Sequence, residues 1–148
     1  LLAGSWLNSE NAERYALLAE EKEVKAFPQQ YMDELAAMKQ YLKVVQAGVL
    51  IGEVKGKDLS PAHALAMSAS LLRQDAFDTE EVSYEQAIAY LRKEAIALSE
   101  TAPRGYVLLT YRNIPLGFVK NIGNRANNLY PQEWRIRSGY LPEEIRTF

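Results

Sequence analysis

The apolar positions along the chain first predict two helices. Residues 9–25 are polar and helical in character, with Ser9 available as a cap. Phe27 and Pro28 end this segment, because proline cannot continue a helix. The next segment carries an apolar stripe at helical spacing: Tyr31, Leu35, Met38 and Leu42. We expect this stripe to pack on a core.

The middle of the chain predicts two strands and a helix. Apolar runs at 42–47 and 49–54 are punctuated by glycines, and the sequence KGKD closes them with a turn. Ser60 suits a helix cap and Pro61 suits the first helical position. Together they predict a helix over 61–74, whose alanines would pack closely on a sheet.

The remaining part predicts one more helix and three strands. Ser83 and Gln86 have the spacing of a capping box. The apolar stripe behind it consists of Ile88, Leu91, Ala95 and Leu98. Residues 105–112 and 116–121 predict a hairpin around the turn RNIP, and EWRIR at 133–137 alternates like a short strand. This order of elements is that of an α+β protein rather than of repeated βαβ units.

Composition places the chain among globular proteins. Its 148 residues suit one domain or a compact pair, and 48% hydrophobic with 24% charged residues is too apolar for disorder. No apolar run approaches the roughly 18 residues that span a bilayer, and the N-terminus lacks a signal-peptide pattern. We expect a cytoplasmic protein without a membrane partner. Because an initiator Met is missing, we also expect a fragment of a longer protein.

The residue types of most catalytic and metal sites are missing from the sequence. There is no cysteine, which excludes disulfides, thiolate–zinc sites and thiol nucleophiles within the chain. The single histidine, His63, is expected to be a packing or surface residue. Neither a glycine-rich phosphate loop nor a metal-binding motif occurs. The sequence therefore predicts no catalytic, cofactor or metal site in this chain.

Charge is distributed unevenly along the chain. Residues 1–100 carry 10 Lys or Arg and 16 Asp or Glu, a net charge of −6. Residues 101–138 carry 6 Lys or Arg and only Glu133 as an acid, a net charge of +5. Asparagines crowd the same basic stretch: Asn121, Asn124, Asn127 and Asn128. The stretch is either a solvated basic face or a site for a polyanion.

The residue types in 120–137 suit RNA. Arg and Lys neutralise phosphates, Asn can read base edges or a ribose 2′-hydroxyl, and Tyr or Trp can stack on unpaired bases. Each type also has a structural interpretation, since paired asparagines suit turns. The alternation in EWRIR predicts that Trp134 is buried in the core, and that Arg135 and Arg137 share an exposed face.

Three stretches resemble a known family: AGVLIGEVKGKDLSPAHALAMS, YLRKEAI and PLGFVKNIGNRANNLYPQEWRIR. They are similar to the C-terminal region of the Sun-type RNA 5-methylcytosine methyltransferases, in particular the bacterial 16S ribosomal RNA small-subunit methyltransferase F group. The match covers about residues 40–138, and its last stretch is the most specific. The resemblance implies an α+β fold: a compact PUA-like mixed β-barrel or sheet, flanked by helices and preceded by a helical leader.

The resemblance also implies a division of labour. Residues 1–38 would be a helical leader to a missing catalytic domain, 39–100 a first subdomain with a β-hairpin and two helices, and 101–148 the PUA-like RNA-binding segment and tail. The family's reaction uses a cysteine thiolate and S-adenosylmethionine. We expect both in the missing catalytic domain. This chain alone is therefore not expected to be an enzyme. The implied partners are 16S ribosomal RNA and the catalytic domain of the same polypeptide. Transfer RNA stays open as an alternative substrate.

The matched motif supplies the residues expected to contact RNA. They are Lys120, Asn124, Arg125, Asn127, Asn128, Arg135 and Arg137. Tyr130 is expected to stack on a base, and Lys55 and Lys57 in the KGKD turn are secondary candidates. Pro131 and Trp134 are expected to fix the loop and the core. The rival hypothesis is an intramolecular scaffold that packs on the methyltransferase core without touching RNA.

Overall fold

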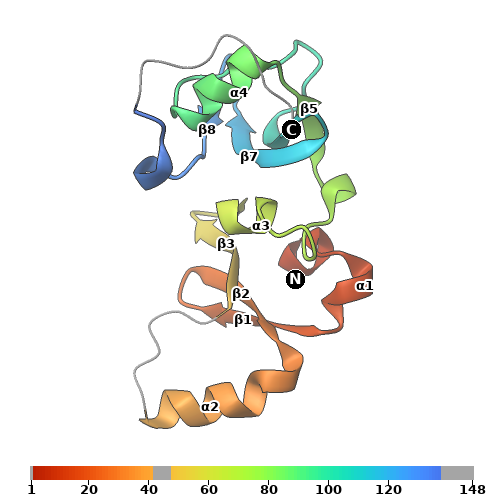
Figure 1. Ribbon diagram of the computed structural model, residues 1–148, viewed down its shortest axis with the longest axis vertical. Coiled ribbons are helices and arrows are strands. Elements are labelled where there is room, and N and C mark those ends of the chain that lie inside the picture. The colour runs from red at the N-terminus through yellow and green to blue at the C-terminus, as the bar shows by residue number, and fades with distance from the viewer. Residues whose placement is uncertain (1, 42–47, 138–148) are drawn as a thin grey trace, which may run out of the picture.

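Two four-stranded sheets lie one above the other along the long axis of the molecule (Figure 1). The structure is a computed structural model that describes residues 2–41 and 48–137. The first sheet is antiparallel, in the order β1 (Tyr15–Glu20), β2 (Glu23–Pro28), β3 (Val49–Lys55), β4 (Asp58–Pro61). The second sheet has the order β5 (Asp78–Glu81), β6 (Gly105–Tyr111), β7 (Ile114–Asn121), β8 (Ala126–Asn128). Only its β5–β6 pair is parallel.

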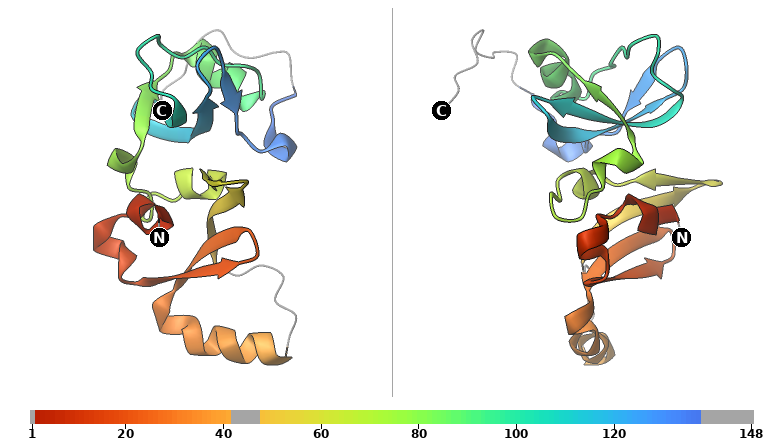
Figure 2. Two further views of the ribbon diagram at one scale, coloured as in Figure 1. Left: turned by 180° about the vertical axis from the view of Figure 1, so that it is seen from behind. Right: turned by 90° about the vertical axis from the view of Figure 1, so that its right-hand side faces the viewer.

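Short helices cover the sheets at different levels. One lies between the sheets, one covers the outer face of the second sheet and one lies beyond the first sheet (Figures 1 and 2). In that order they are α3 (His63–Ala66), α4 (Tyr84–Leu91) and α2 (Met32–Tyr41). The others are α1 (Ser9–Ala12) and the 3₁₀ helices η1 (Leu2–Trp6), η2 (Gln29–Tyr31), η3 (Gln74–Ala76) and η4 (Gln132–Trp134). Within the described residues, no helix is long and apolar enough to cross a membrane.

The inner face of the second sheet packs on α3, which in turn packs on the first sheet. Leu108 and Phe118, both fully buried, share one apolar cluster with Trp6 and Leu65. Phe77 connects the aromatic members of this cluster, with ring centroids 5.3 Å from Trp6 and 4.8 Å from Phe118. Burying side chains of this size stabilises the fold by about 1.5–3 kcal/mol each, so this cluster joins the two sheets.

The outer face of the same sheet packs on α4. Val107 and Val119 alternate with the inward-facing residues and join Tyr90 in a second apolar cluster. The hydroxyl of Tyr90 donates to the carbonyl oxygen of Phe118 at 3.0 Å. A sheet covered on both faces needs apolar residues at successive positions, which explains the uninterrupted run VLL in β6.

Patterns of short range predicted several elements correctly. α2, the β6–β7 hairpin and the α4 capping box are confirmed. In that box Ser83 N donates to Gln86 Oε1 at 3.0 Å, and Gln86 N donates to Ser83 Oγ at 3.2 Å. The run at 49–54 forms β3, whereas the run at 42–47 lies outside the described residues. The α+β class is confirmed, as two open sheets within the described residues.

The helix predicted over 9–25 is wrong. α1 ends at Ala12, and β1 and β2 form a hairpin whose turn holds Glu21 at a φ of 52°. β2 also pairs with β3 and buries Val24 and Ala26. Burial and strand pairing outweigh the helical propensity of the charged run. The predicted leader therefore contains a hairpin, while the domain boundaries implied by the resemblance stay predictions.

Most of the helix predicted over 61–74 is also wrong. Ser60 and Pro61 are the last residues of β4, so Ser60 caps no helix. The N-cap position of α3 is Ala62, and the helix has only four residues. β4 is an edge strand, where a sheet tolerates proline because the missing N–H faces no partner.

The strand predicted over 133–137 is wrong as well. Its first residues belong to η4, and Trp134 is 61% exposed instead of buried. The neighbour of β7 is β8, which lies upstream in the stretch predicted to be a loop. Because β6 and β8 occupy both edges of β7, no ladder position remains there for 133–137.

Gly117 in β7 provides a test of the packing between α4 and the sheet. Its φ is +152°, and an added Cβ would overlap the Tyr90 hydroxyl and lie 2.9 Å from His63 Nδ1. We expect Gly117→Ala to lower the free energy of unfolding by about 2–4 kcal/mol, since buried Tyr90 has no room to move. Urea denaturation measures this loss.

Gly56→Ala is the matched control. Gly56 also has a positive φ, +63°, but no atom lies within 4 Å of an added Cβ. The free energy of unfolding of Gly56→Ala should fall by only about 1–2 kcal/mol, because alanine in the left-handed backbone conformation costs about that much. Equal losses in the two variants would contradict the tight contact at Gly117.

Candidate nucleic-acid interface

The β7–β8 hairpin carries most of the basic and amide residues expected to contact RNA. Lys120 is the register partner of Asn127, so their side chains share one face of the hairpin. Phe118, two residues before Lys120, packs toward the first sheet from that face. Val119 and Ala126 occupy the opposite face, in the cluster with α4. The part of the hairpin near Phe118 and Val119 is thus buried and apolar, and the part near its turn carries the polar side chains.

Lys120 connects this hairpin to the first sheet. Its Nζ lies 3.2 Å from Asp58 Oδ2 and 5.3 Å from the centroid of the Tyr106 ring. The hydrogen bond to Asp58 is the main reason that the pKa of Lys120 lies above its ordinary value. The Lys120 side chain is still 36% exposed, so the ammonium keeps access to solvent and to a ligand.

Asn121 attaches the segment before β6 to the β7–β8 turn. Its Nδ2 donates to the carbonyls of Ala102 at 3.1 Å and Pro103 at 2.9 Å, and its Oδ1 accepts from Gly123 N at 3.0 Å. The adjacent Arg104 side chain lies against Gly123, where an added Cβ would be 2.8 Å from Nη2. Gly123 has a φ of +108°. A glycine therefore suits both the turn and the approach of the guanidinium.

We give the name basic hairpin surface to five polar residues on or beside the β7–β8 hairpin: Arg104, Lys120, Asn124, Arg125 and Asn127. Three of them line a hollow of about 390 Å³: Arg104, Asn124 and Arg125. Glu100 also lines the hollow, but neither arginine forms an ion pair within the described residues. The sequence prediction counted Arg104 as charge but not as a candidate site residue. The Gly105–Asn121 pair of the β6–β7 ladder and the Asn121 side-chain bonds bring its segment to the turn.

The side-chain amide of Asn128 forms its hydrogen bonds with other parts of the chain. Its Nδ2 donates to the carbonyls of Tyr90 and Glu94, both at 2.9 Å. Its Oδ1 accepts from Tyr130 N at 2.9 Å. The side chain connects the end of α4 to the segment after β8, which gives it a structural role.

Tyr130 is also part of the packing and not an open stacking surface. Its half-buried ring lies edge-on to Tyr90 at 5.5 Å and to His63 at 5.1 Å. Its carbonyl accepts from Lys93 Nζ at 2.6 Å, and the same Nζ donates to Asn128 O at 2.9 Å. Lys93 was not a predicted site residue.

The other predicted cations lie elsewhere. Arg135 and Arg137 flank Ile136. The Ile136 N–H donates to Leu91 O at 2.8 Å, so both arginines lie beside the C-terminal end of α4. Arg135 is half-buried and Arg137 is exposed. Lys57 is exposed in the turn between β3 and β4.

A groove of about 440 Å³ runs between the first sheet with α3 and the segment that follows β8, and we call it the inter-sheet groove. One wall comes from β3, β4 and α3, and includes Glu53, Lys55 and His63. The other wall consists of Lys93 together with residues from 129–134, including Trp134. Lys55 is the only predicted RNA contact in this groove.

His63 packs between aromatic rings in this groove. Its ring lies edge-on to Tyr130 and to Trp134, with centroids 5.1 Å and 5.5 Å away. Burial lowers the pKa of His63 below its ordinary value, so the imidazole is neutral at pH 7. Its buried Nδ1 has no hydrogen-bond partner within the described residues. This packing agrees with the expectation for His63.

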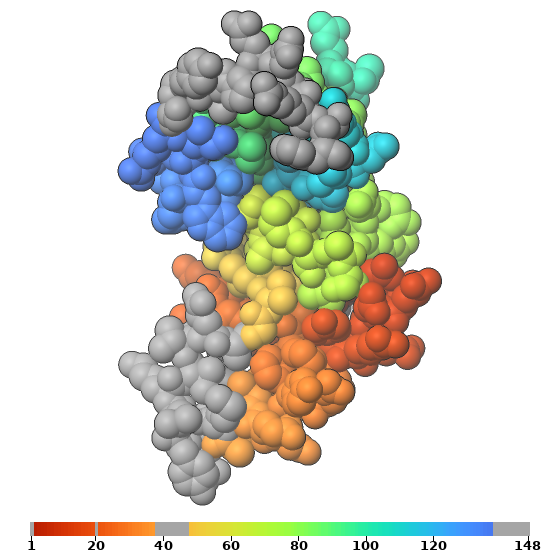
Figure 3. Space-filling model, in the orientation of Figure 1, coloured from red at the N-terminus to blue at the C-terminus, as the bar shows by residue number. Residues whose placement is uncertain are grey.

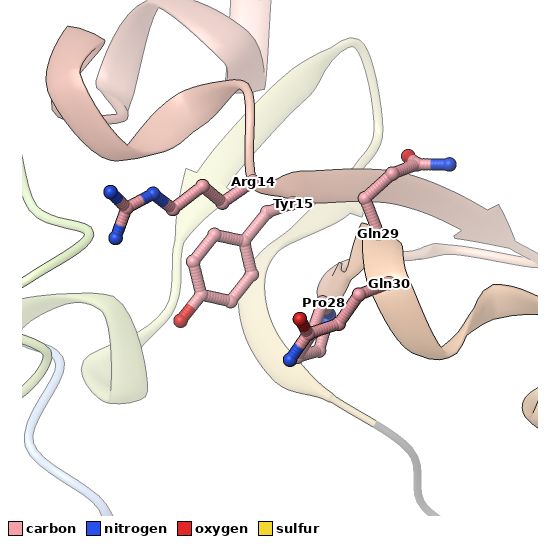
Figure 4. A pocket seen from close by; sticks show the side chains of 5 residues that line it. All are labelled: Arg14, Tyr15, Pro28, Gln29 and Gln30. Atoms are coloured by element: carbon pink, nitrogen blue, oxygen red, sulfur yellow. The ribbon is translucent and has the colours of Figure 1, made fainter.

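A third hollow, of about 590 Å³, lies where β1 begins and β2 ends. Figure 4 shows the Tyr15 ring between the side chains of Arg14 and Pro28, with Gln29 and Gln30 beyond. Arg14 is the only charged residue in this lining, so the hollow offers little to a polyanion. In the described part of the chain, no group of three or more His, Asp or Glu side chains could hold a metal ion.

The second sheet, its covering helix and the basic hairpin are compatible with one class of protein, the PUA-like α+β domains. A family comparison defines the segment more closely. Residues 78–136 match the methyltransferase RsmF PUA domain, and this part of the chain belongs to that domain family.

Individual relatives extend the similarity over most of the chain. A protein of Klebsiella pneumoniae named Ribosomal RNA small subunit methyltransferase F is 31% identical over 128 residues, covering 86% of this chain and 25% of that protein. Proteins of the same name from Shewanella woodyi and Citrobacter koseri are 28% and 30% identical, over 82% and 87% of this chain. The chain spans about a quarter of the length of these relatives. The family resemblance inferred from the motifs is confirmed.

The neighbouring Asn127 and Asn128 allow a test of their different roles. Asn128→Ala removes three hydrogen bonds and should lower the free energy of unfolding by about 2 kcal/mol. Asn127→Ala, at an exposed position on the same strand, should change it by less than about 0.5 kcal/mol. Chemical denaturation of both variants measures the difference. Equal stability of the two would refute the structural role of Asn128.

Proposed function

We propose that this chain is the RNA-recognition part of an S-adenosylmethionine-dependent ribosomal RNA (cytosine-5) methyltransferase, and that the basic hairpin surface contacts the RNA. The observation that carries this proposal is the convergence of Arg104 and Arg125 on one hollow without an ion-pair partner in the described residues. The similarity to proteins named Ribosomal RNA small subunit methyltransferase F supports the choice of nucleic acid.

The surface combines two kinds of contact. Arg104, Arg125 and Lys120 supply positive charge for phosphates, which accounts for much of the affinity of such complexes. Asn124 and Asn127 are exposed and can donate to and accept from base edges or ribose hydroxyls. Lys57 and Arg137, also exposed, remain candidates for outer phosphate contacts. Asn128 and Tyr130 are not among the proposed contacts, because the fold occupies them.

The chemistry of methyl transfer would belong to another part of the enzyme. The chain has no cysteine to supply the thiolate of this reaction. We assign the S-adenosylmethionine site and the nucleophile to a catalytic domain of the same polypeptide. The role of this chain is to hold 16S ribosomal RNA in the cytoplasm, which raises the effective concentration of the target cytosine at that distant site.

RNA binding at several salt concentrations tests the proposal. The logarithm of the affinity for a ribosomal RNA fragment should fall linearly with the logarithm of salt concentration. Arg125→Ala and Arg104→Ala should each reduce this slope by about one unit, because each removes one phosphate contact. Filter binding or fluorescence anisotropy provides the measurement.

Arg14→Ala is the control, since this exposed arginine lies beside the hollow at β1, apart from the hairpin. The salt dependence of RNA binding by Arg14→Ala should have the same slope as that of the unaltered chain. If the chain shows no salt-dependent RNA binding but associates with the catalytic domain through Arg104 and Arg125, the scaffold hypothesis replaces this proposal.

A further inference from the structure

Trp134 presents a large aromatic surface to solvent at the edge of the inter-sheet groove. It is 61% exposed, whereas the other tryptophan, Trp6, is 5% exposed. The Trp134 ring is held by its edge contact with His63, at 5.5 Å and 73°. Its backbone N–H donates to Pro131 O at 3.1 Å, so the short helix η4 also fixes its position. An exposed ring in a fixed position suits stacking with a flat ligand.

The polar groups of the groove suit a nucleobase better than a bare anion. Two cations, Lys55 and Lys93, stand beside two acids, Glu53 and Glu133. Lys93 Nζ uses two of its three N–H groups on backbone carbonyls, which leaves one for a ligand. Carboxylates can accept hydrogen bonds from the amino group of a base. The balanced charge would give little attraction to phosphate alone.

The groove and the basic hairpin surface meet at the β3–β4 turn. Lys55 in the groove is the register partner of Asp58, and Asp58 forms the ion pair with Lys120. In Figure 3 the blue surface that ends the described chain adjoins the yellow surface of β3 and the yellow-green surface of α3. An RNA strand on the hairpin could therefore place one nucleotide in the groove.

We propose that the inter-sheet groove binds one unpaired nucleotide of the RNA, with its base stacked on Trp134 and its polar edge toward Glu53 or Glu133. The volume of about 440 Å³ lies in the range of small-ligand pockets, and is far too small for a duplex. This inference rests on the proposed RNA-binding function and extends it. One wall of the groove lies outside residues 78–136, so the site requires the first sheet and α3 as well as the matched segment.

Two RNA hairpins that differ only by one bulged nucleotide test the proposal. The unaltered chain should bind the bulged RNA about tenfold more tightly, which is the size of one base–aromatic stack. Trp134→Ala should abolish this preference and leave binding of the fully paired RNA unchanged. Trp134→Phe should restore part of it. Arg125→Ala should weaken binding of both RNAs by the same factor, because it removes a phosphate contact.

Two further measurements test whether the preference for the bulge depends on Trp134 and not on any exposed aromatic ring. Tyr31→Ala removes another exposed aromatic ring, 50% exposed and outside the groove, and should keep the preference for the bulge. Bulged RNA should quench the tryptophan fluorescence of the unaltered chain but not that of Trp134→Ala, where only buried Trp6 remains.

Each negative result has a distinct meaning. Equal affinity of the unaltered chain for the two RNAs would overturn the nucleotide site and leave the proposed function standing. A Trp134→Ala variant that keeps its preference for the bulge would overturn the site in the same way. Absence of binding to either RNA would overturn both proposals.

Discussion

Burial of the β6–β7 hairpin on both faces is the constraint on which the rest of the structure depends. Leu108 and Phe118 belong to the apolar cluster that includes residues of the first sheet, while Val119 on the opposite face belongs to the cluster with α4. Gly117 lacks a side chain at the point where the Tyr90 hydroxyl approaches the strand. Because the same two strands supply both apolar clusters, neither the first sheet nor α4 could leave without exposing apolar surface to water. The two sheets therefore stabilise each other.

This constraint also decides where polar side chains can bind a ligand. Both faces of the hairpin base are covered, so binding groups remain at its far end and in the groove beside it. The asparagines of this stretch divide accordingly. Asn121 and Asn128 hold backbone segments together, and Asn124 and Asn127 face solvent. A composition that suggested one RNA-binding surface thus divides into amides that hold the fold together and amides that stay exposed.

The accuracy of the sequence predictions depended on the range of the interactions involved. The capping box at Ser83 and Gln86 involves residues three apart, and the prediction was correct. The hairpin β1–β2 was predicted as helix, because β2 is stabilised by pairing with β3 and β1 by pairing with β2, and neither strand shows this in its own pattern. The alternation in EWRIR indicated a strand, but β8 had already taken the edge of β7. For the candidate site, motif and charge proposed Lys120 and Arg125, whereas the tertiary structure added Arg104, which lines the same hollow as Arg125.

The sequence by itself determined the α+β class, the charge asymmetry and the motif that identifies the family, because these are properties of residue order and composition. It also determined two local elements, the capping box at Ser83 and the β6–β7 hairpin. Only the tertiary structure decided which amide side chains form hydrogen bonds within the fold, that Trp134 faces solvent and that the first sheet forms a groove with the segment after β8. Exposure and convergence depend on partners far away in the chain. A periodic pattern distinguishes the two faces of a segment but does not specify what covers either of them.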